Sequence, residues 1–316
     1  MALFRILVLS LLVFFHAQAS TPLVEGKTYR YPLGWRSLFG SGELVYSQGV
    51  YHLKAKLLFV GAGTYFRTNA AEVQKHGLLR VAPPAKYFEK PFYSFADAPA
   101  FLKDRLNIIL RTVESVFDTP FFKLKIEPVF IDERQILPPE SINELSYNAY
   151  QSDLFSAINQ LYSDPSGKNA RAAVIYLNAI PNSQVATPTI WDLYSNPLLF
   201  AHEFAHLMGT HSEGYELEAY PANGVMNGEA DFDAFLKLAP KGMKISFLRS
   251  DFNEAMQRML RRAEPPLDKE SIDTFFTETT VDLYNESAYE DYWQWSPEKR
   301  RQEAETKVKG WLRKTH

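Results

Sequence analysis

The spacing of hydrophobic and polar positions changes near residue 76, and this change divides the chain into two patterns. Residues 20–76 alternate aromatic and polar positions around glycines, as in GELVYSQGVYHLKAKLLFVGAGTYF, which predicts two or three strands joined by turns. From there on, segments with helix spacing alternate with segments with strand spacing. The pattern predicts a small β-rich region over 20–76, an α/β (α+β) domain over 77–264 and a helical extension over 265–316.

The first half of the α/β domain is expected to contain a long helix, a strand and a shorter helix. Asp97 can cap the long helix, and Pro99 fits its first turn. Its apolar positions form one stripe: Leu102, Leu106, Ile109, Leu110, Val113, Val116 and Phe117. FKLKIEPVFID then alternates as a strand, in which Pro128 indicates an edge or a bulge. The shorter helix is expected over 152–162.

The second half is expected to contain a buried strand and two helices. AAVIYLN at 172–178 is a continuous apolar run, which is typical of a strand covered on both faces. Asn196 and Pro197 then supply an N-cap and a first-turn proline for a helix that carries HEFAHLMGTH. A closing helix is expected over SDFNEAMQRMLRRA, capped by Ser250 and ended before Pro265.

Composition narrows the class of protein mainly by exclusion. The chain has 316 residues, 46% of them hydrophobic, which is enough for one sizeable core with an appendage or for two small domains. A formal net charge of -3 gives no electrostatic reason to expect a nucleic acid partner. The chain has no cysteine, which excludes a disulfide framework, a lipid-modified N-terminal cysteine and a cysteine-held latent state.

The first 19 residues have the pattern of an export signal. Arg5 precedes an apolar run over 6–15, and Ala17-Gln18-Ala19 is a small-x-small cleavage site. That run is well short of the roughly 20 residues that span a bilayer. We therefore expect cleavage after Ala19, no stable membrane insertion of the mature chain, and a secreted or periplasmic location. An exported chain without a thiol is more typical of bacteria.

The stretch HEFAHLMGTH at 202–211 has the spacing of a zinc site. His202 and His206 lie one turn apart on the same helix face, so both imidazoles can converge on one cation. Glu203 lies beside the first ligand, where its carboxylate can act as general base toward a metal-bound water. A third ligand is expected, and His211 follows a glycine at which the helix can end. Histidines that are only hydrogen bonded in a core are the alternative.

These residues resemble the metzincin zinc endopeptidases, whose motif is H-E-x-x-H-x-x-G-x-x-H, followed by a methionine turn. Four positions match residue by residue: His202, Glu203, His206 and Gly209. The last histidine of the motif would fall at Ser212, whereas His211 comes one residue early. Met226 in NGVMNG resembles the methionine turn, with flanking glycines that permit a tight reversal. The tyrosine that some members carry two residues later is replaced by Gly228.

The order of elements over 77–263 is most similar to the adamalysin branch of the metzincins, although those proteins are usually rich in disulfides. The resemblance implies a mixed twisted sheet, an active-site helix and a zinc ion held by His202, His206 and His211. It also implies peptide-bond hydrolysis with Glu203 as general base and a protein or peptide substrate. A short edge segment at 184–187 would pair with that substrate by strand addition.

Several alternatives stay open at this point. A glutamate could replace the third histidine as zinc ligand, and four lie after the motif: Glu213, Glu216, Glu218 and Glu229. The protein could also be a metal-binding pseudoenzyme or a cell-wall hydrolase. In the extension, 268–292 is acidic and 297–316 is basic, which favours two helices packed on the catalytic domain and on each other. A docking arm is the alternative.

Overall fold

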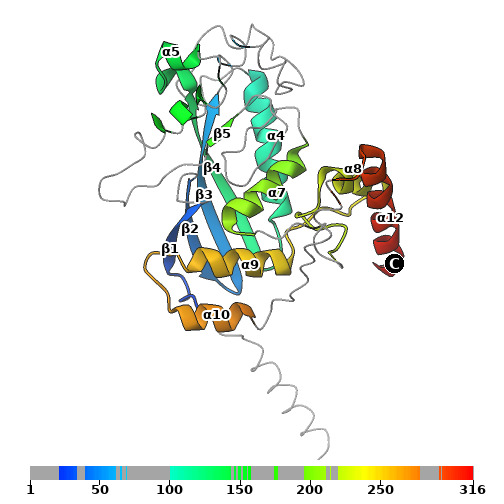
Figure 1. The fold of residues 1–316 in the computed structure, drawn as a ribbon. Helices are drawn as coiled ribbons and strands as arrows, with labels where there is room; N and C mark the ends of the chain where they lie inside the picture. Colours follow the sequence, from blue (N-terminus) through cyan, green and yellow to red (C-terminus); the bar gives the residue numbers. More distant parts are fainter. Residues whose placement is uncertain are drawn as a thin grey trace, which may run out of the picture.

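The structure is a computed structural model, and several segments of the chain can be described in it (Figure 1). These are residues 21–33, 40–61, 65, 69, 100–143, 146, 149–150, 152–154, 156–157, 174–176, 196–210, 214, 220–277, 292 and 294–315. The predicted export signal, the predicted edge segment at 184–187 and His211 lie outside the described residues.

A five-stranded mixed sheet forms the centre of the fold. Its strands are β1 (Thr28–Leu33), β2 (Gly40–Ser47), β3 (Val50–Gly61), β4 (Phe122–Asp132) and β5 (Val174–Tyr176). β1, β2 and β3 pair antiparallel in sequence order, whereas β4 and β5 run parallel to β3. The predicted mixed α/β class is therefore confirmed.

β3 pairs with a strand of the β-rich region and also with strands of the α/β region. Its first part pairs with β2 through a two-residue turn in which Gln48 and Gly49 have φ of 52° and 83°, as in a type I′ hairpin. Its last part pairs with β5, and β4 pairs along its whole length from Tyr51↔Phe122 to Gly61↔Asp132. The β-rich region thus supplies three strands, as predicted, and shares one sheet with strands of the α/β region.

Two helices lie side by side against the sheet, α4 (Ala100–Val116) and α7 (Pro197–Met208) (Figure 1). The predicted stripe of α4 is buried wherever its side chains are described, from Leu106 to Phe117. Phe117 packs edge-on against Phe204 of α7, with ring centroids 5.3 Å apart. A short 3-10 helix η3 (Glu133–Gln135) and α5 (Pro139–Ile142) follow β4, and the described residues 152–154 and 156–157 of the predicted shorter helix are helical.

The closing helix α9 (Arg249–Leu260) begins one residue earlier and ends three residues earlier than the predicted span of 250–263. The predicted cap, Ser250, is wrong. The Asp251 carboxylate accepts a hydrogen bond from the Leu248 backbone N–H at 3.0 Å and so caps the helix from its third position. Beyond α9, Glu264 exchanges backbone hydrogen bonds with Arg30 of β1, which anchors the end of this helix to the sheet.

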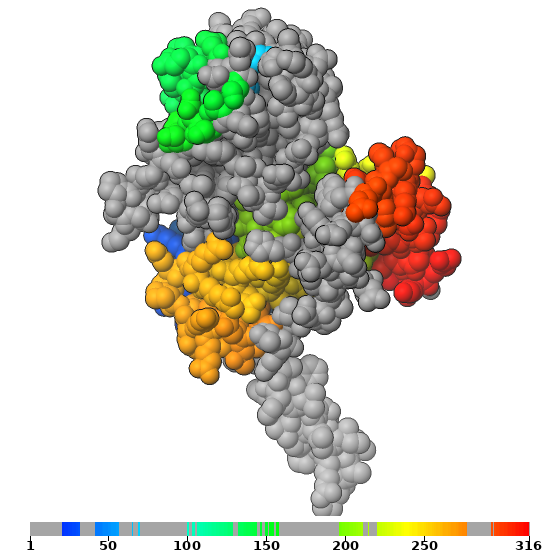
Figure 2. All heavy atoms as spheres, in the orientation of Figure 1, coloured from blue at the N-terminus to red at the C-terminus, as the bar shows by residue number. Residues whose placement is uncertain are grey.

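The extension forms two described helices, α10 (Lys269–Thr277) and α12 (Pro297–Thr315). They do not pack on each other as expected: α10 lies against α9, whereas α12 lies against α8 (Glu229–Leu238) at one flank of the molecule (Figures 1 and 2). Each buries its own apolar residues, such as Phe276 of α10 and Val308 of α12. None of the helices described is both long and apolar enough to cross a membrane.

Candidate metal centre

The helix that carries the motif begins and ends where the sequence predicts. The Asn196 side chain accepts a hydrogen bond from the Leu198 N–H at 3.0 Å, and Pro197 occupies the first helical position. The helix ends at Gly209, whose φ is 120°, a value that side chains with a Cβ rarely adopt. The chain therefore leaves the helix three residues after the second histidine, as a third ligand beyond the helix would require.

The two imidazoles of the motif face each other at close range. The Nε2 atoms of His202 and His206 lie 3.1 Å apart, and both residues are 7% exposed. Two nitrogens that are bound to zinc at 2.0–2.1 Å in a tetrahedral site lie roughly 3.3 Å apart. The separation therefore matches that of two ligands of one zinc ion.

The other nitrogen of each ring is directed at backbone carbonyl oxygens. His206 Nδ1 lies 2.7 Å from the Thr210 oxygen, and His202 Nδ1 lies 3.2 Å from the Val225 oxygen and 3.1 Å from the Asn227 oxygen. A carbonyl can only accept, so both Nδ1 atoms carry a proton and donate it. In the neutral rings, both Nε2 atoms then present a lone pair toward the other ring.

Two lone pairs at 3.1 Å repel each other unless a proton or a cation lies between them. Metal-bound histidines usually donate their second ring N–H to a carbonyl or carboxylate, which fixes the tautomer and the ring orientation. His202 and His206 both have this arrangement. The donor set and its geometry thus fit a zinc ion held by the two Nε2 atoms.

Glu203 lies between these histidines in sequence and is 8% exposed. Among the described residues, no hydrogen bond or ion pair engages its carboxylate. A buried carboxylate without a protein partner is costly unless water or a cation contacts it. A carboxylate beside the first of two histidine ligands is the kind of group that can exchange a proton with a nearby water molecule.

Two of the three predicted ligands, His202 and His206, lie among the described residues. His211 and three of the rival glutamates, Glu213, Glu216 and Glu218, lie outside them. Glu229 is exposed at the start of α8, and within the described ranges no three histidine, aspartate or glutamate side chains gather at one point. The described neighbours of 211–213 are both fixed near the site: Thr210 contacts His206, and the Gly214 N–H donates to the Met226 carbonyl at 2.6 Å.

Met226 lies in a turn, and its side chain is fully buried. The carbonyls on either side of it, those of Val225 and Asn227, are the two that receive the His202 Nδ1 proton. The turn is thus directly connected to the first histidine of the motif.

The glycines on either side of this turn, Gly224 and Gly228, were expected to permit a tight reversal of the backbone. Neither of them has a positive φ. A Cβ on Gly224 would lie 2.3 Å from the Tyr220 ring, and a Cβ on Gly228 would lie 2.8 Å from the Tyr292 hydroxyl. These positions require glycine because aromatic side chains approach the backbone closely.

A buried chain of hydrogen bonds fixes the same turn to α9. The Met226 N–H donates to the Tyr220 hydroxyl at 3.0 Å, and this hydroxyl donates to the Asp251 carboxylate at 2.8 Å. The Asp251 backbone carbonyl also accepts the Thr210 hydroxyl, on the side of His206. Burial raises the pKa of Asp251 to about 7, because desolvation outweighs these stabilising hydrogen bonds.

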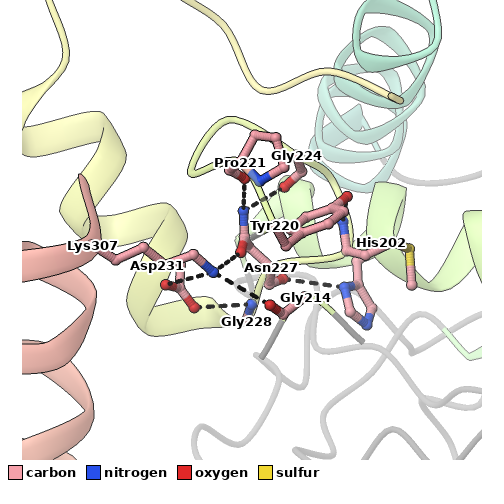
Figure 3. Close-up of polar contacts among 10 residues, drawn as sticks. His202, Gly214, Tyr220, Pro221, Gly224, Asn227, Gly228, Asp231 and Lys307 are labelled. Atoms are coloured by element: carbon pink, nitrogen blue, oxygen red, sulfur yellow. Dashed lines mark hydrogen bonds and ion pairs between the residues drawn. The ribbon is translucent and has the colours of Figure 1, made fainter. Parts of the chain in front are cut away.

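Three side chains of this network are not apparent from the sequence: Tyr220, Asp251 and Lys307. Figure 3 shows that Lys307 reaches the Met226 turn from α12, and its amino group lies 2.5 Å from Asn227 Oδ1. These residues lie far apart in sequence and in no shared motif. The only signal that the sequence offers is the position of Asp251 near the start of a predicted helix, where an acidic residue can accept a hydrogen bond from the backbone.

Comparison with known proteins identifies no relative of this chain: no family model matches it, and neither do curated proteins or solved structures.

Proposed function

We propose that this protein is an exported zinc-dependent endopeptidase of the metzincin-like kind. The observation that supports this best is the pair of Nε2 atoms of His202 and His206, 3.1 Å apart, with both Nδ1 atoms donating to backbone carbonyls. Two acceptors that face each other at this distance need a proton or a cation between them, and a zinc ion bound by both nitrogens would supply it. His211 is the proposed third ligand, since the residues on both sides of 211–213 contact partners of the site.

The chemistry follows from Glu203 and the two imidazoles. Zinc bound at this site would supply Lewis acidity toward a peptide carbonyl and a water molecule of lowered pKa. Glu203 would accept a proton from a water molecule as the water oxygen bonds to the carbonyl carbon, and would deliver that proton to the amine that leaves when the C–N bond breaks. The carbonyls of Thr210 and Asn227 keep both rings in the tautomer whose Nε2 lone pair can act as a metal ligand.

The proposed location and substrate rest on the sequence. The export signal over 1–19 supports secretion or delivery to a periplasm, with a mature chain that begins at Ser20. A protein or peptide substrate is the proposal that follows from the metzincin-like motif. A cell-wall crosslink is the second candidate, because a zinc site defines the reaction type more closely than it defines the substrate.

Zinc content and turnover of one preparation test the proposal. We expect about one zinc per chain, cleavage of unfolded casein, and no cleavage of cell-wall sacculi. Glu203→Gln should keep the zinc and lose turnover by about 10²- to 10⁴-fold, because the proton acceptor is gone. Glu229→Gln is the matched control on an exposed position and should change neither quantity.

Three outcomes would contradict parts of the proposal. A folded protein without stoichiometric zinc would refute the metal centre, and cleavage of sacculi without cleavage of casein would replace the peptidase by a cell-wall hydrolase. If Glu229→Ala removed the zinc while His211→Ala retained it, the third ligand would be a glutamate and the metzincin-like assignment would be wrong.

A further inference from the structure

The amino group of Lys307 is unusually enclosed for a lysine on an outer helix. Its side chain is 27% exposed, compared with 56% for Lys309 one half-turn later on α12. Lys309 forms an ion pair with Glu305 on the helix surface, whereas Lys307 extends inward past α8 to the Met226 turn (Figure 3). Burial lowers the pKa of Lys307, and nearby Asp231 opposes that change. A half-buried cation of this kind is costly unless acceptors surround it.

Three acceptors surround this ammonium group. Its Nζ lies 2.5 Å from Asn227 Oδ1, 3.4 Å from the Gly214 carbonyl oxygen and 3.7 Å from Asp231 Oδ1. It also lies 5.8 Å from the centre of the Tyr220 ring, within the range of a cation–π contact. All four partners belong to the Met226 turn or to the segments that lead into and out of it.

The contact with Asn227 fixes the orientation of that amide. Asn227 Nδ2 donates to the carbonyls of Pro221 and Gly224, both at 2.9 Å, while Oδ1 receives the Lys307 proton. A flipped amide would place its NH₂ against an ammonium group and its oxygen against two carbonyls. Lys307 therefore fixes the orientation of the Asn227 side chain, which hydrogen bonds to the Pro221 and Gly224 carbonyls of the turn.

The same residue connects the lysine to the metal centre. The Asn227 backbone carbonyl accepts the His202 Nδ1 proton at 3.1 Å. The Gly214 carbonyl is the second backbone acceptor of Lys307, and the Gly214 N–H donates to Met226 in the same turn. One ammonium group thus joins the segment that follows the histidine motif to the turn that orients His202.

We propose that Lys307 is a positioning residue of the metal centre, which acts through Asn227 to hold the carbonyls that orient His202. The proposal rests on the proposed zinc site and extends it to α12, so that the C-terminal helix is part of the site. His206 receives its partner from Thr210 and has no contact with this lysine among the described residues. Loss of Lys307 should therefore disturb one imidazole and spare the other.

Lys307→Met tests this because it keeps the length and the apolar stem of the side chain but removes the donors. Zinc affinity, measured by competition with a chelator, should fall about 10-fold, the low end of the range for residues that orient metal ligands. The histidine ¹⁵N resonances of His202 should shift while those of His206 stay in place. Lys309→Met, on the exposed face of the same helix, is the matched control and should match the wild type in both measurements.

Chemical rescue separates the ammonium group from general damage to α12. The chain has no cysteine, so Lys307→Cys introduces a single thiol. Its thiolate displaces bromide from 2-bromoethylamine to form a C–S bond, which restores an ammonium group at nearly the length of lysine. Alkylation in denaturant, followed by refolding, should restore zinc affinity to within about twofold of the wild type. Alkylation with iodoacetamide, which adds a neutral amide, should leave the affinity low.

The outcomes distinguish this inference from the proposed function. If the wild type binds no zinc, the proposed function fails, and this inference fails with it. If the wild type binds zinc and Lys307→Met binds it equally well, or shifts both histidines alike, the inference alone is overturned. Should Lys307→Met not fold, Lys307→Arg decides: a planar guanidinium cannot occupy the same position, so affinity should still fall several-fold, and wild-type affinity would overturn the inference.

Discussion

The two histidines of the motif lie one turn apart on α7, yet distant parts of the chain orient one of them and adjacent residues orient the other. His206 donates to Thr210, four residues later, at the end of its own helix. His202 donates to carbonyls 23 and 25 residues later, in the Met226 turn. That turn is held by Tyr220, Asn227 and, from α12, Lys307.

The difference shows that one half of the site follows from local sequence and the other half from tertiary packing. The local half needs only a helix that ends at Gly209. The remote half needs the segment around Tyr220, the Met226 turn and α12 to be in place. Substitutions far from the motif should therefore affect His202 selectively. The two halves meet at Asp251, whose backbone carbonyl contacts Thr210 and whose carboxylate contacts Tyr220.

The largest effect on stability is expected at Asp251, which contacts both halves of the site. Burial raises the pKa of Asp251 to about 7 from an ordinary value of 3.8. Between these values the folded protein keeps a proton that the unfolded chain releases, so the contribution of Asp251 to stability falls as pH rises from about 4 to about 7 and is constant above. Asp251→Asn keeps an acceptor for Tyr220 but does not titrate.

As pH rises from about 4 to about 7, the free energy of unfolding of the wild type should therefore fall, relative to that of Asp251→Asn, by on the order of 4 kcal/mol. Urea unfolding of both proteins at several pH values measures this. Curves that run parallel from pH 4 to pH 7 would show that Asp251 titrates normally in the fold and that the two halves are not joined through a buried acid.

A smaller effect is expected from the remote half alone. Tyr220→Phe removes the hydroxyl that accepts from Met226 and donates to Asp251, and it leaves both of these groups buried. The free energy of unfolding should fall by about 1–3 kcal/mol. The matched control is Tyr31→Phe, because no described residue hydrogen bonds the buried Tyr31 hydroxyl. This control should be neutral or slightly stabilising, and an equal loss from both variants would contradict the role of Tyr220.

The smallest effect is expected at Ser250. The capping contact of α9 comes from Asp251, while the Ser250 hydroxyl only reaches that carboxylate at 3.4 Å. Ser250→Ala should change the free energy of unfolding by less than about 0.5 kcal/mol. A loss of 1 kcal/mol or more, the value of about one lost N-cap, would restore Ser250 as the cap of this helix.

The same division explains what could be predicted from the sequence. The boundaries of α7, with its cap at Asn196 and its end at Gly209, follow from residues next to each other in the chain. The apolar stripe of α4 and the alternation of β4 were equally local, and both elements are present. Periodicity and capping residues carry this kind of information because each depends on a few neighbouring positions.

Contacts between distant segments left no such pattern. Gly224 and Gly228 were correctly associated with a turn, but the Tyr292 hydroxyl that approaches Gly228 comes from a distant segment of the chain. In the sequence, Lys307 is one of several cations in a basic helix. Only its position beside Asn227 in the structure distinguishes it from Lys309. The tertiary structure, rather than local spacing, decides which polar residues of this protein are buried.

The most direct test of the account is the protonation of the two imidazoles. Long-range ¹H–¹⁵N correlation spectra of histidine-labelled protein, near neutral pH, report which ring nitrogen carries the proton. The proposed metal centre predicts the Nδ1–H tautomer for both His202 and His206 and, when zinc is added, a shift of both Nε2 resonances. An Nε2–H tautomer that persists in the presence of zinc at either residue would contradict the metal centre.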